Sequence, residues 1–154
     1  MKIVEGDLIE LALAGEFDLI VHGCNCFCKM GAGIARSIKE VFPEAYEADL
    51  NTKSGSREKL GTISSAEVLR EGVNLIVING YTQFTPSGIG VLVDYDAVGA
   101  VFNSIKREYS GQRIGYPMIG AGLAKGDWGI IAEIIKNALP DEDHTLVKYI
   151  EKGR

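Results

Sequence analysis

The chain has 154 residues, of which 46% are apolar and 24% charged; these values favour one globular domain over residues 1–154 and exclude a disordered chain. No apolar run reaches the roughly 18–20 residues of a membrane helix, and the N-terminus lacks the apolar stretch of a secretory signal. We therefore expect a cytoplasmic protein with no membrane partner. The net charge of −5 also argues against a nucleic-acid partner.

Apolar runs alternate with helical periodicities along the chain. In chain order, the pattern predicts a strand at 3–4, a helix at 7–14, a strand at 19–21, a helix at 34–42, strands at 62–69 and 75–78, a helix at 95–105, a strand at 113–119, a helix at 128–138 and a strand at 146–150. This order predicts a three-layer α/β/α fold with a mixed, mostly parallel sheet. Ligands of such sheets bind at the carboxyl ends of the strands. The irregular segment 51–61 is expected to be a mobile surface loop.

The first glycine-rich loop joins a predicted strand to a predicted helix. The sequence HGCNC at 22–26 ends the strand, and KMGAGIA at 29–35 opens the helix. Glycines let backbone N–H groups approach an anion closely, and a helix N-terminus adds positive partial charge. The loop lacks the Walker GK[ST] sequence, and Arg36 stands where a dinucleotide fingerprint has its third glycine. We interpret it as a phosphate cradle, with a packing turn as the alternative.

The second glycine-rich loop, IGAGLAKGDW at 119–128, also joins a strand to a helix. Its glycines leave the backbone free to wrap around a ligand. Asp127 stands directly before the predicted helix, where aspartate is a favoured N-cap worth about 1 kcal/mol. Two such loops at strand ends suggest a ligand with two phosphates.

Three cysteines stand at positions 24, 26 and 28. Their odd number and tight spacing argue against a disulfide framework and for a reducing compartment. Alternate residues of a strand lie about 6.6–7 Å apart, too far for several of them to share one zinc ion with His22. We therefore expect no metal and no cofactor. A catalytic cysteine paired with His22 is a less favoured alternative.

Taken together, these motifs resemble the macrodomain family. The matching segments are Gly6-Asp7-Leu8, the first glycine-rich loop at 22–35, NGYTQ at 79–83 and the second loop at 119–128. They follow one another in the family's order over about residues 1–150. They look most like the branch that contains ADP-ribose-1''-phosphate phosphatases and the terminal ADP-ribose protein glycohydrolase. The resemblance implies a macrodomain-type fold and, as ligand, ADP-ribose or one of its derivatives.

The resemblance also implies where the ligand binds. Asp7, with Leu8 beside it, would hydrogen-bond the adenine amino group, and Asn25 would bind the distal ribose. Tyr81 and Phe84 follow the middle strand, and one of them is a candidate for packing against that ribose, with simple loop packing as the alternative. The two glycine-rich loops would hold the diphosphate through Gly31, Ala32, Gly33, Ile34, Gly120, Ala121, Gly122 and Leu123.

The chain departs from the glycohydrolase of the family at two positions. Gly80 stands near the place of its catalytic lysine, and Ala124 stands at the place of its catalytic aspartate. His22 and Asp127 match catalytic positions of the phosphatase branch, so removal of phosphate from ADP-ribose-1''-phosphate is the leading functional hypothesis. The alternatives are a hydrolase that cuts ADP-ribosyl or acetyl esters, with an ADP-ribosylated protein as partner, and a non-catalytic ADP-ribose binding module.

Overall fold

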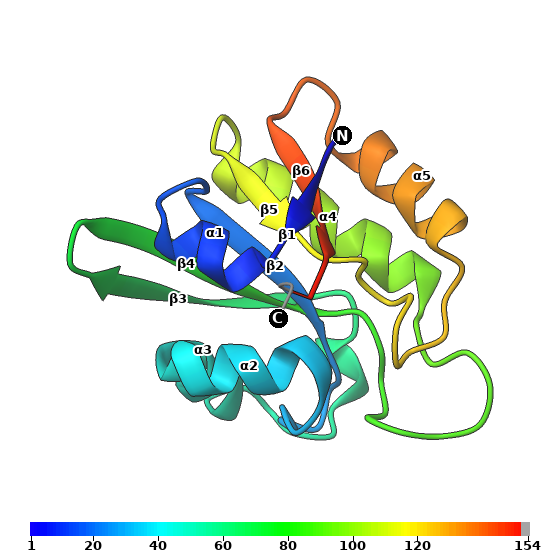
Figure 1. Cartoon of the computed structure of the whole chain (residues 1–154). Helices are drawn as coiled ribbons and strands as arrows, with labels where there is room; N and C mark the ends of the chain where they lie inside the picture. The colour runs from blue at the N-terminus through cyan, green and yellow to red at the C-terminus, as the bar shows by residue number, and fades with distance from the viewer. Residues whose placement is uncertain (152–154) are drawn as a thin grey trace.

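The computed structural model describes residues 1–151 and contains a six-stranded sheet between two layers of helices (Figure 1). The strands are β1 (Lys2–Gly6), β2 (Leu19–Cys24), β3 (Ile63–Arg70), β4 (Val73–Tyr81), β5 (Ile114–Tyr116) and β6 (His144–Tyr149). The helices are α1 (Leu8–Leu13), α2 (Gly33–Val41), α3 (Pro43–Leu50), α4 (Tyr95–Tyr109) and α5 (Trp128–Ala138), with one short 3-10 helix, η1 (Arg57–Lys59). The strand order is β1-β6-β5-β2-β4-β3, and only β3 and β4 pair antiparallel. The predicted mixed, mostly parallel α/β/α fold is confirmed.

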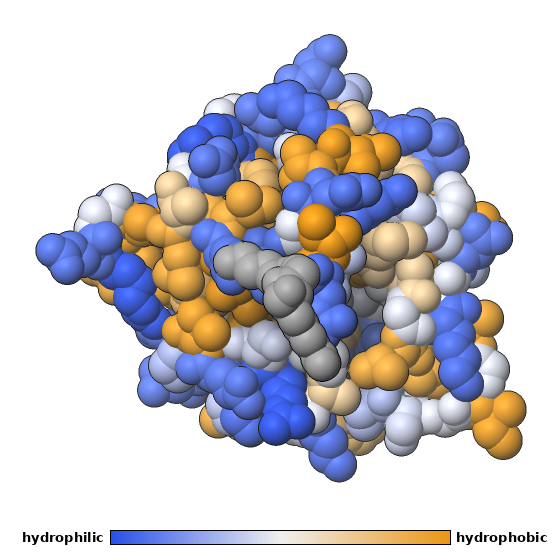
Figure 2. Space-filling view, viewed as in Figure 1, coloured by the Kyte–Doolittle hydropathy of each residue, from blue (hydrophilic) through white to orange (hydrophobic). Residues whose placement is uncertain are grey.

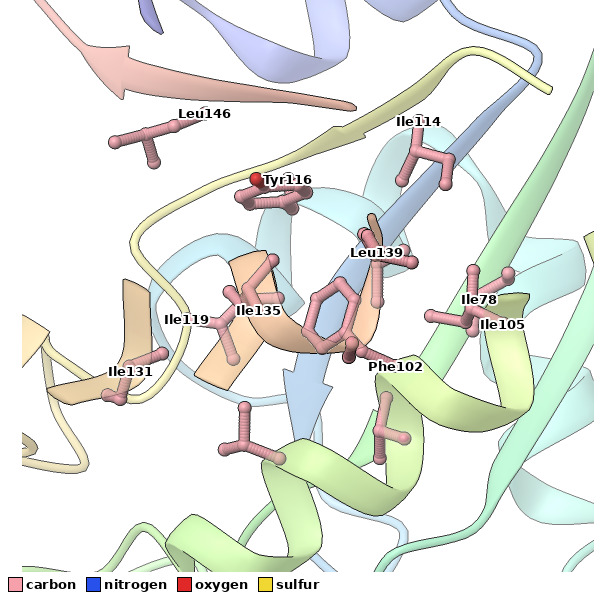
Figure 3. Packing of buried hydrophobic residues seen from close by; sticks show 14 of the residues in the cluster. Ile78, Phe102, Ile105, Ile114, Tyr116, Ile119, Ile131, Ile135, Leu139 and Leu146 are labelled. Atoms are coloured by element: carbon pink, nitrogen blue, oxygen red, sulfur yellow. The ribbon is translucent and has the colours of Figure 1, made fainter. Parts of the chain in front are cut away.

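Two apolar cores lie on opposite faces of the sheet. The core beneath α4 and α5 includes Phe102 and Ile135, both fully buried (Figure 3). The core beneath α1, α2 and α3 includes Phe42. The neighbouring β2 residues Ile20 and Val21 belong to different cores, because successive side chains of a strand point to opposite faces. Strand β2 is therefore buried on both faces, and it lies between β5 and β4, inside the sheet.

The expected elements differ from the observed ones where proline interrupts the chain. The helix predicted at 34–42 stops at Val41, and Pro43 begins a separate helix, α3, that the periodicity did not reveal. Proline is favoured at the first position of a helix, but it cannot continue a preceding one because it lacks an N–H. The strand predicted at 113–119 ends at Tyr116, directly before Pro117. The loop that leaves β5 consequently begins earlier than expected.

The 51–61 segment is not the free surface loop expected from its sequence. It contains η1, and the Lys59 side chain is only 7% exposed. Lys59 Nζ donates a hydrogen bond to Cys28 Sγ at 3.5 Å, and the Gly55 amide donates to the Cys26 carbonyl at 2.7 Å. The segment therefore packs against the first glycine-rich loop and supports it.

The surface mixes polar and apolar residues. Apolar patches lie among charged residues on the face shown in Figure 2. Edge strand β1 contributes exposed apolar side chains, with Ile3 58% and Val4 40% exposed. Within residues 1–151, no helix has the length and apolar character needed to span a membrane.

Candidate functional site

A cavity of about 530 Å³ opens at the carboxyl ends of β2 and β5. This volume lies within the range of small-molecule sites, about 300–1,000 Å³. The cavity brings both glycine-rich loops together with the segment that follows β4. Its lining consists of Gly23, Cys24, Asn25, Lys29, Gly31, Ala32, Gly33, Ile34, Ala35, Gln83, Pro86, Ser87, Pro117, Met118, Ile119, Gly120, Gly122, Leu123 and Ala124. All the predicted diphosphate-binding residues of the loops are in this lining except Ala121.

The N-terminus of α2 faces the cavity without a side-chain cap. Its N-cap residue is Ala32, in an extended conformation, and no side chain accepts a hydrogen bond from the first turn. Aspartates do cap three other helices, namely Asp7 in α1, Asp94 in α4 and Asp127 in α5. The first amides of a helix need an acceptor and carry positive partial charge. At α2 these groups are left to an anion or to solvent.

The second glycine-rich loop offers a further row of donors. The amides of Gly122, Leu123 and Ala124 all belong to cavity-lining residues and donate to no acceptor within residues 1–151. The turn that exposes them is closed by a hydrogen bond from the Gly126 amide to the Gly120 carbonyl, 2.6 Å long. A Cβ on Gly126 would lie 2.5 Å from that carbonyl oxygen, so the turn requires glycine there. Successive free N–H groups of this kind form an anion-binding concavity.

Asn25 braces the first loop from within. It is 8% exposed, its Nδ2 donates to the Lys29 carbonyl at 2.8 Å, and its Oδ1 accepts from the Phe27 amide at 2.9 Å. Asn25 also lines the cavity, and each end of its amide has capacity for one more hydrogen bond. Its contact with a distal ribose stays a prediction that this geometry allows.

His22 does not line the cavity. It is fully buried, and its Nε2 lies 2.6 Å from Asn79 Oδ1. Asn79 Nδ2 donates to the Ala45 carbonyl and to Ser64 Oγ; the amide oxygen therefore faces His22, and Nε2 carries the hydrogen. Burial lowers the pKa of His22 to about 4, against an opposing effect of the hydrogen bond to Asn79. His22 is thus a neutral imidazole on β2 that is buried outside the cavity, and this placement argues against the predicted catalytic role.

The cysteine-nucleophile alternative depends on Cys24, which borders the cavity. Its Sγ lies 3.4 Å from His22 Nε2 and 3.7 Å from Nδ1, the ring nitrogen that lacks a hydrogen. Burial raises the pKa of Cys24 and lowers that of His22, so the proton stays on sulfur. Because the thiolate is the reactive form of cysteine, this pair has a structural rather than a nucleophilic character.

Asp127 occupies the position of a helix cap. Its Oδ1 accepts from the Ile130 amide at 3.3 Å, and its own amide donates to the Tyr95 hydroxyl at 3.0 Å. The residue is exposed and does not line the cavity. The capping role considered for it from sequence is observed, whereas the predicted catalytic contact is not.

Asp7 and Leu8 follow β1, at the same carboxyl edge of the sheet as the cavity but outside its lining. Asp7 Oδ1 accepts from the Glu10 amide at 3.1 Å and so caps α1, while Leu8 is buried in the core. The predicted contact of Asp7 with adenine requires the ligand to reach across β5 and β6, and it stays a prediction.

Tyr81 packs in the interior of the fold, and the structure does not bring it to the predicted ligand. It is fully buried and does not line the cavity. Its hydroxyl donates to Asp49 Oδ1 at 2.7 Å and lies 2.8 Å from Ser64 Oγ, while Lys59 Nζ sits 4.4 Å from the ring centroid. Tyr81 therefore stabilises the interior under α3, in agreement with the packing alternative.

Three polar cavity residues, Lys29, Gln83 and Ser87, were not predicted to contact a ligand. Gln83, two residues beyond β4, lines the cavity, and its Nε2 donates to the Thr85 carbonyl at 2.9 Å. Lys29 lines it from the first loop. The signal that could have identified Gln83 is its place at the carboxyl end of a central strand, where ligands of parallel sheets bind.

Comparison with known proteins identifies relatives over different lengths. No family model matches the chain. An uncharacterised 17.5 kDa protein from the tk-vs intergenic region of phage T4 is 37% identical over 141 residues, which cover 88% of this chain and 87% of that protein. An ADP-ribose 1''-phosphate phosphatase of Aspergillus oryzae is 37% identical over 46 residues, which cover 30% of this chain but only 21% of the phosphatase.

Solved structures match over nearly the whole chain. A Bacteroides thetaiotaomicron protein of unknown function has a TM-score of 0.80 at 25% identity, covering 96% of this chain and 98% of that one. The macrodomain of Thermus aquaticus DarG has a TM-score of 0.71 at 21% identity, covering 98% and 97%. Thermosipho africanus DarTG in complex with ADP-ribose has a TM-score of 0.68 at 15% identity, covering 100% of this chain and 43% of that one. These likenesses confirm the predicted macrodomain fold.

Proposed function

Because this chain belongs to one family with the phage T4 17.5 kDa protein and has the macrodomain fold, we propose that it binds ADP-ribose or a derivative of it. The observation that supports this proposal is that two rows of backbone N–H donors without acceptors belong to one cavity. One row is at the uncapped N-terminus of α2, and the other consists of the Gly122–Ala124 amides. Each row suits one phosphate of a diphosphate. The structural relative from Thermosipho africanus was solved with ADP-ribose, which agrees with this choice.

The proposed reaction is the removal of phosphate from ADP-ribose-1''-phosphate. Water attacks phosphorus, the bond from phosphorus to the 1''-oxygen breaks, a proton from the water passes to that oxygen, and ADP-ribose and inorganic phosphate are released. Backbone amides would stabilise the charge that develops on the phosphoryl oxygens, which is the usual way that phosphoryl transfer is catalysed. Similarity of part of the chain to the Aspergillus oryzae phosphatase supports this choice.

A specific observation favours a second candidate, a binding module without catalytic activity. Neither His22 nor Asp127 lines the cavity, so the lining lacks both groups predicted to move protons. A module that only binds ADP-ribose needs the donor rows and nothing more.

Two measurements on the same sample test these proposals. Calorimetry should detect binding of ADP-ribose and much weaker binding of AMP, which lacks the second phosphate and the distal ribose. Phosphate release from ADP-ribose-1''-phosphate, run beside ADP-ribose release from a peptide carrying ADP-ribosylated glutamate, identifies the reaction. Binding without either release would select the binding module, and absence of ADP-ribose binding would contradict the proposed function as a whole.

A further inference from the structure

Within residues 1–151, one residue provides all the formal charge of the cavity lining. Lys29 is the sole lysine, arginine, aspartate or glutamate among these lining residues, in a chain whose net charge is −5. The excess of negative charge therefore lies outside the cavity. A lone ammonium group in an otherwise neutral cavity favours a ligand that brings its own negative charge.

The loop fixes the Lys29 backbone and leaves its side chain free. The Asn25 amide holds the Lys29 carbonyl at 2.8 Å, and the next residue, Met30, is only 2% exposed. On the other side Cys28 adopts a left-handed conformation, with φ of 57°, and its Sγ donates to the Asp49 carbonyl at 3.1 Å. The Lys29 side chain is exposed and forms no ion pair with any of residues 1–151. The loop therefore fixes the position of the Lys29 backbone, and the ammonium group has no carboxylate partner within residues 1–151.

This charge is more than a diphosphate requires, because two rows of neutral amides without acceptors already belong to cavity-lining residues. A phosphate monoester carries nearly two negative charges at neutral pH and binds best to a charged donor. Lys29 is tied directly to Asn25, the residue expected at the distal ribose. We propose that Lys29 contacts the 1''-phosphate and makes the cavity selective for ADP-ribose-1''-phosphate over ADP-ribose, an inference that rests on the proposed function.

The test measures two ligands on one variant. The ligands are ADP-ribose and the phosphonate analogue of ADP-ribose-1''-phosphate, in which a CH2 group replaces the 1''-oxygen so that no turnover occurs. Calorimetry on Lys29→Met should show the analogue binding about 10- to 100-fold more weakly, the usual scale for a hydrogen bond to a charged group. Binding of ADP-ribose should change by less than about twofold, because the amides hold its diphosphate. Lys29→Arg keeps the charge and should retain most of the analogue affinity.

Lys125→Met is the matched control. Lys125 is an exposed lysine of the second glycine-rich loop, and it does not line the cavity. The substitution makes the same change of net charge as Lys29→Met. It should leave the affinity for both ligands unaltered, which separates a local contact from a general effect of charge.

Each other outcome has a distinct meaning. An equal loss for both ligands in Lys29→Met would place the ammonium at the diphosphate and overturn the inference, as would no loss for either. If the wild type binds neither ligand, the proposed ADP-ribose binding fails and the role of Lys29 fails with it. If the wild type binds both ligands but releases no phosphate from ADP-ribose-1''-phosphate, only the proposed reaction is contradicted, and the comparison with Lys29→Met still decides the role of the lysine.

Discussion

Glycines with open space around them mark where a side chain would enter the cavity. A Cβ added to Gly31 or to Gly122 would meet no atom within 4 Å, and both residues line the cavity. Gly33 differs, because its φ of 58° strains any other residue. A substitution at Gly122 therefore tests ligand contact without imposing backbone strain, whereas one at Gly33 mixes the two effects.

We expect Gly122→Val to weaken ADP-ribose binding by about tenfold or more, since the side chain occupies ligand space. The melting temperature should stay close to that of the wild type. Gly99→Ala in α4 is the control, because its Cβ would make one ordinary contact, with Ile134 at 3.5 Å, and Gly99 does not line the cavity. Calorimetry decides, and unchanged affinity in Gly122→Val would show that the second loop does not touch the ligand.

Asp127→Ala separates capping from catalysis. Loss of the cap should lower the free energy of unfolding by about 1 kcal/mol, measured by urea denaturation. Phosphate release should fall by less than about tenfold, because the carboxylate lies outside the cavity lining. A decrease of about 100-fold or more in a folded variant would instead assign the carboxylate to the reaction, as the resemblance to the phosphatase branch implies.

The buried imidazole of His22 predicts a pH dependence of stability. Its pKa is lowered to about 4, mainly by burial, whereas an unfolded chain restores a pKa near 6.5. The unfolded state thus takes up the proton first as the pH falls, and stability present above pH 6.5 is lost towards pH 4. The contribution of His22 to the loss between pH 7 and pH 5 should be about 2 kcal/mol.

Nuclear magnetic resonance isolates the His22 contribution from that of other groups. The His22 ring signals should show no titration between pH 8 and pH 5 in the folded protein. A midpoint near pH 6.5 would mean that the imidazole is solvated, and it would reopen the predicted role in catalysis.

The N-terminus of helix α2 lines the cavity and has no side-chain cap. An aspartate at position 32 should cap the helix as aspartates cap α1, α4 and α5, since Ala32 already has the extended conformation of an N-cap residue. We expect Ala32→Asp to raise the free energy of unfolding by about 1 kcal/mol and to weaken ADP-ribose binding by about tenfold or more. The cap and the phosphate compete for the same amides.

Ala32→Ser supplies the neutral comparison for that experiment. It can cap the helix without adding negative charge, so its affinity loss should be smaller than that of Ala32→Asp. Denaturation and calorimetry on both variants test the pair of effects. A more stable Ala32→Asp that binds ADP-ribose as tightly as the wild type would place the phosphates away from α2.

The elements that sequence could predict are those whose pattern is local. Apolar periodicity identified α4 and α5, and the apolar run at 75–78 identified β4. The sequence did not predict helix α3, because its eight residues have little amphipathic pattern. In addition, a proline such as Pro43 is typical of the end of a preceding helix as well as of the start of a new one. Boundaries that depend on a single proline are visible only once the neighbouring strands are in place.

The candidate site also has a part that local sequence features predict and a part that they do not. The two loops were predictable because glycine and position at a strand end are local features. The sequence could not predict whether the His22 and Tyr81 side chains point to the ligand or to the interior. Strand alternation shows which residues share a face of the sheet but not which face opens to a ligand. Helix α3 packs against β3 and β4, and it supplies the Ala45 carbonyl to Asn79, the partner of His22. It also supplies the Asp49 carboxylate to Tyr81.

At the scale of the whole molecule, ligand binding should stabilise the fold. A ligand at 100 times its dissociation constant that binds only the native state adds about 2.7 kcal/mol. For a chain of this size the melting temperature should rise by about 5–10 °C in ADP-ribose. AMP at the same concentration should produce a clearly smaller rise, and no rise at millimolar ADP-ribose would contradict binding.

A cavity walled by backbone amides has an evolutionary consequence. Every residue except proline carries the N–H that the α2 N-terminus and the 122–124 turn present, so most replacements there preserve the donor. Ligand recognition can then be maintained while side chains change, provided that the glycine-rich turns keep their backbone conformation. A proline is the replacement that deletes a donor outright, and lineages that retain binding should lack it at positions 122–124.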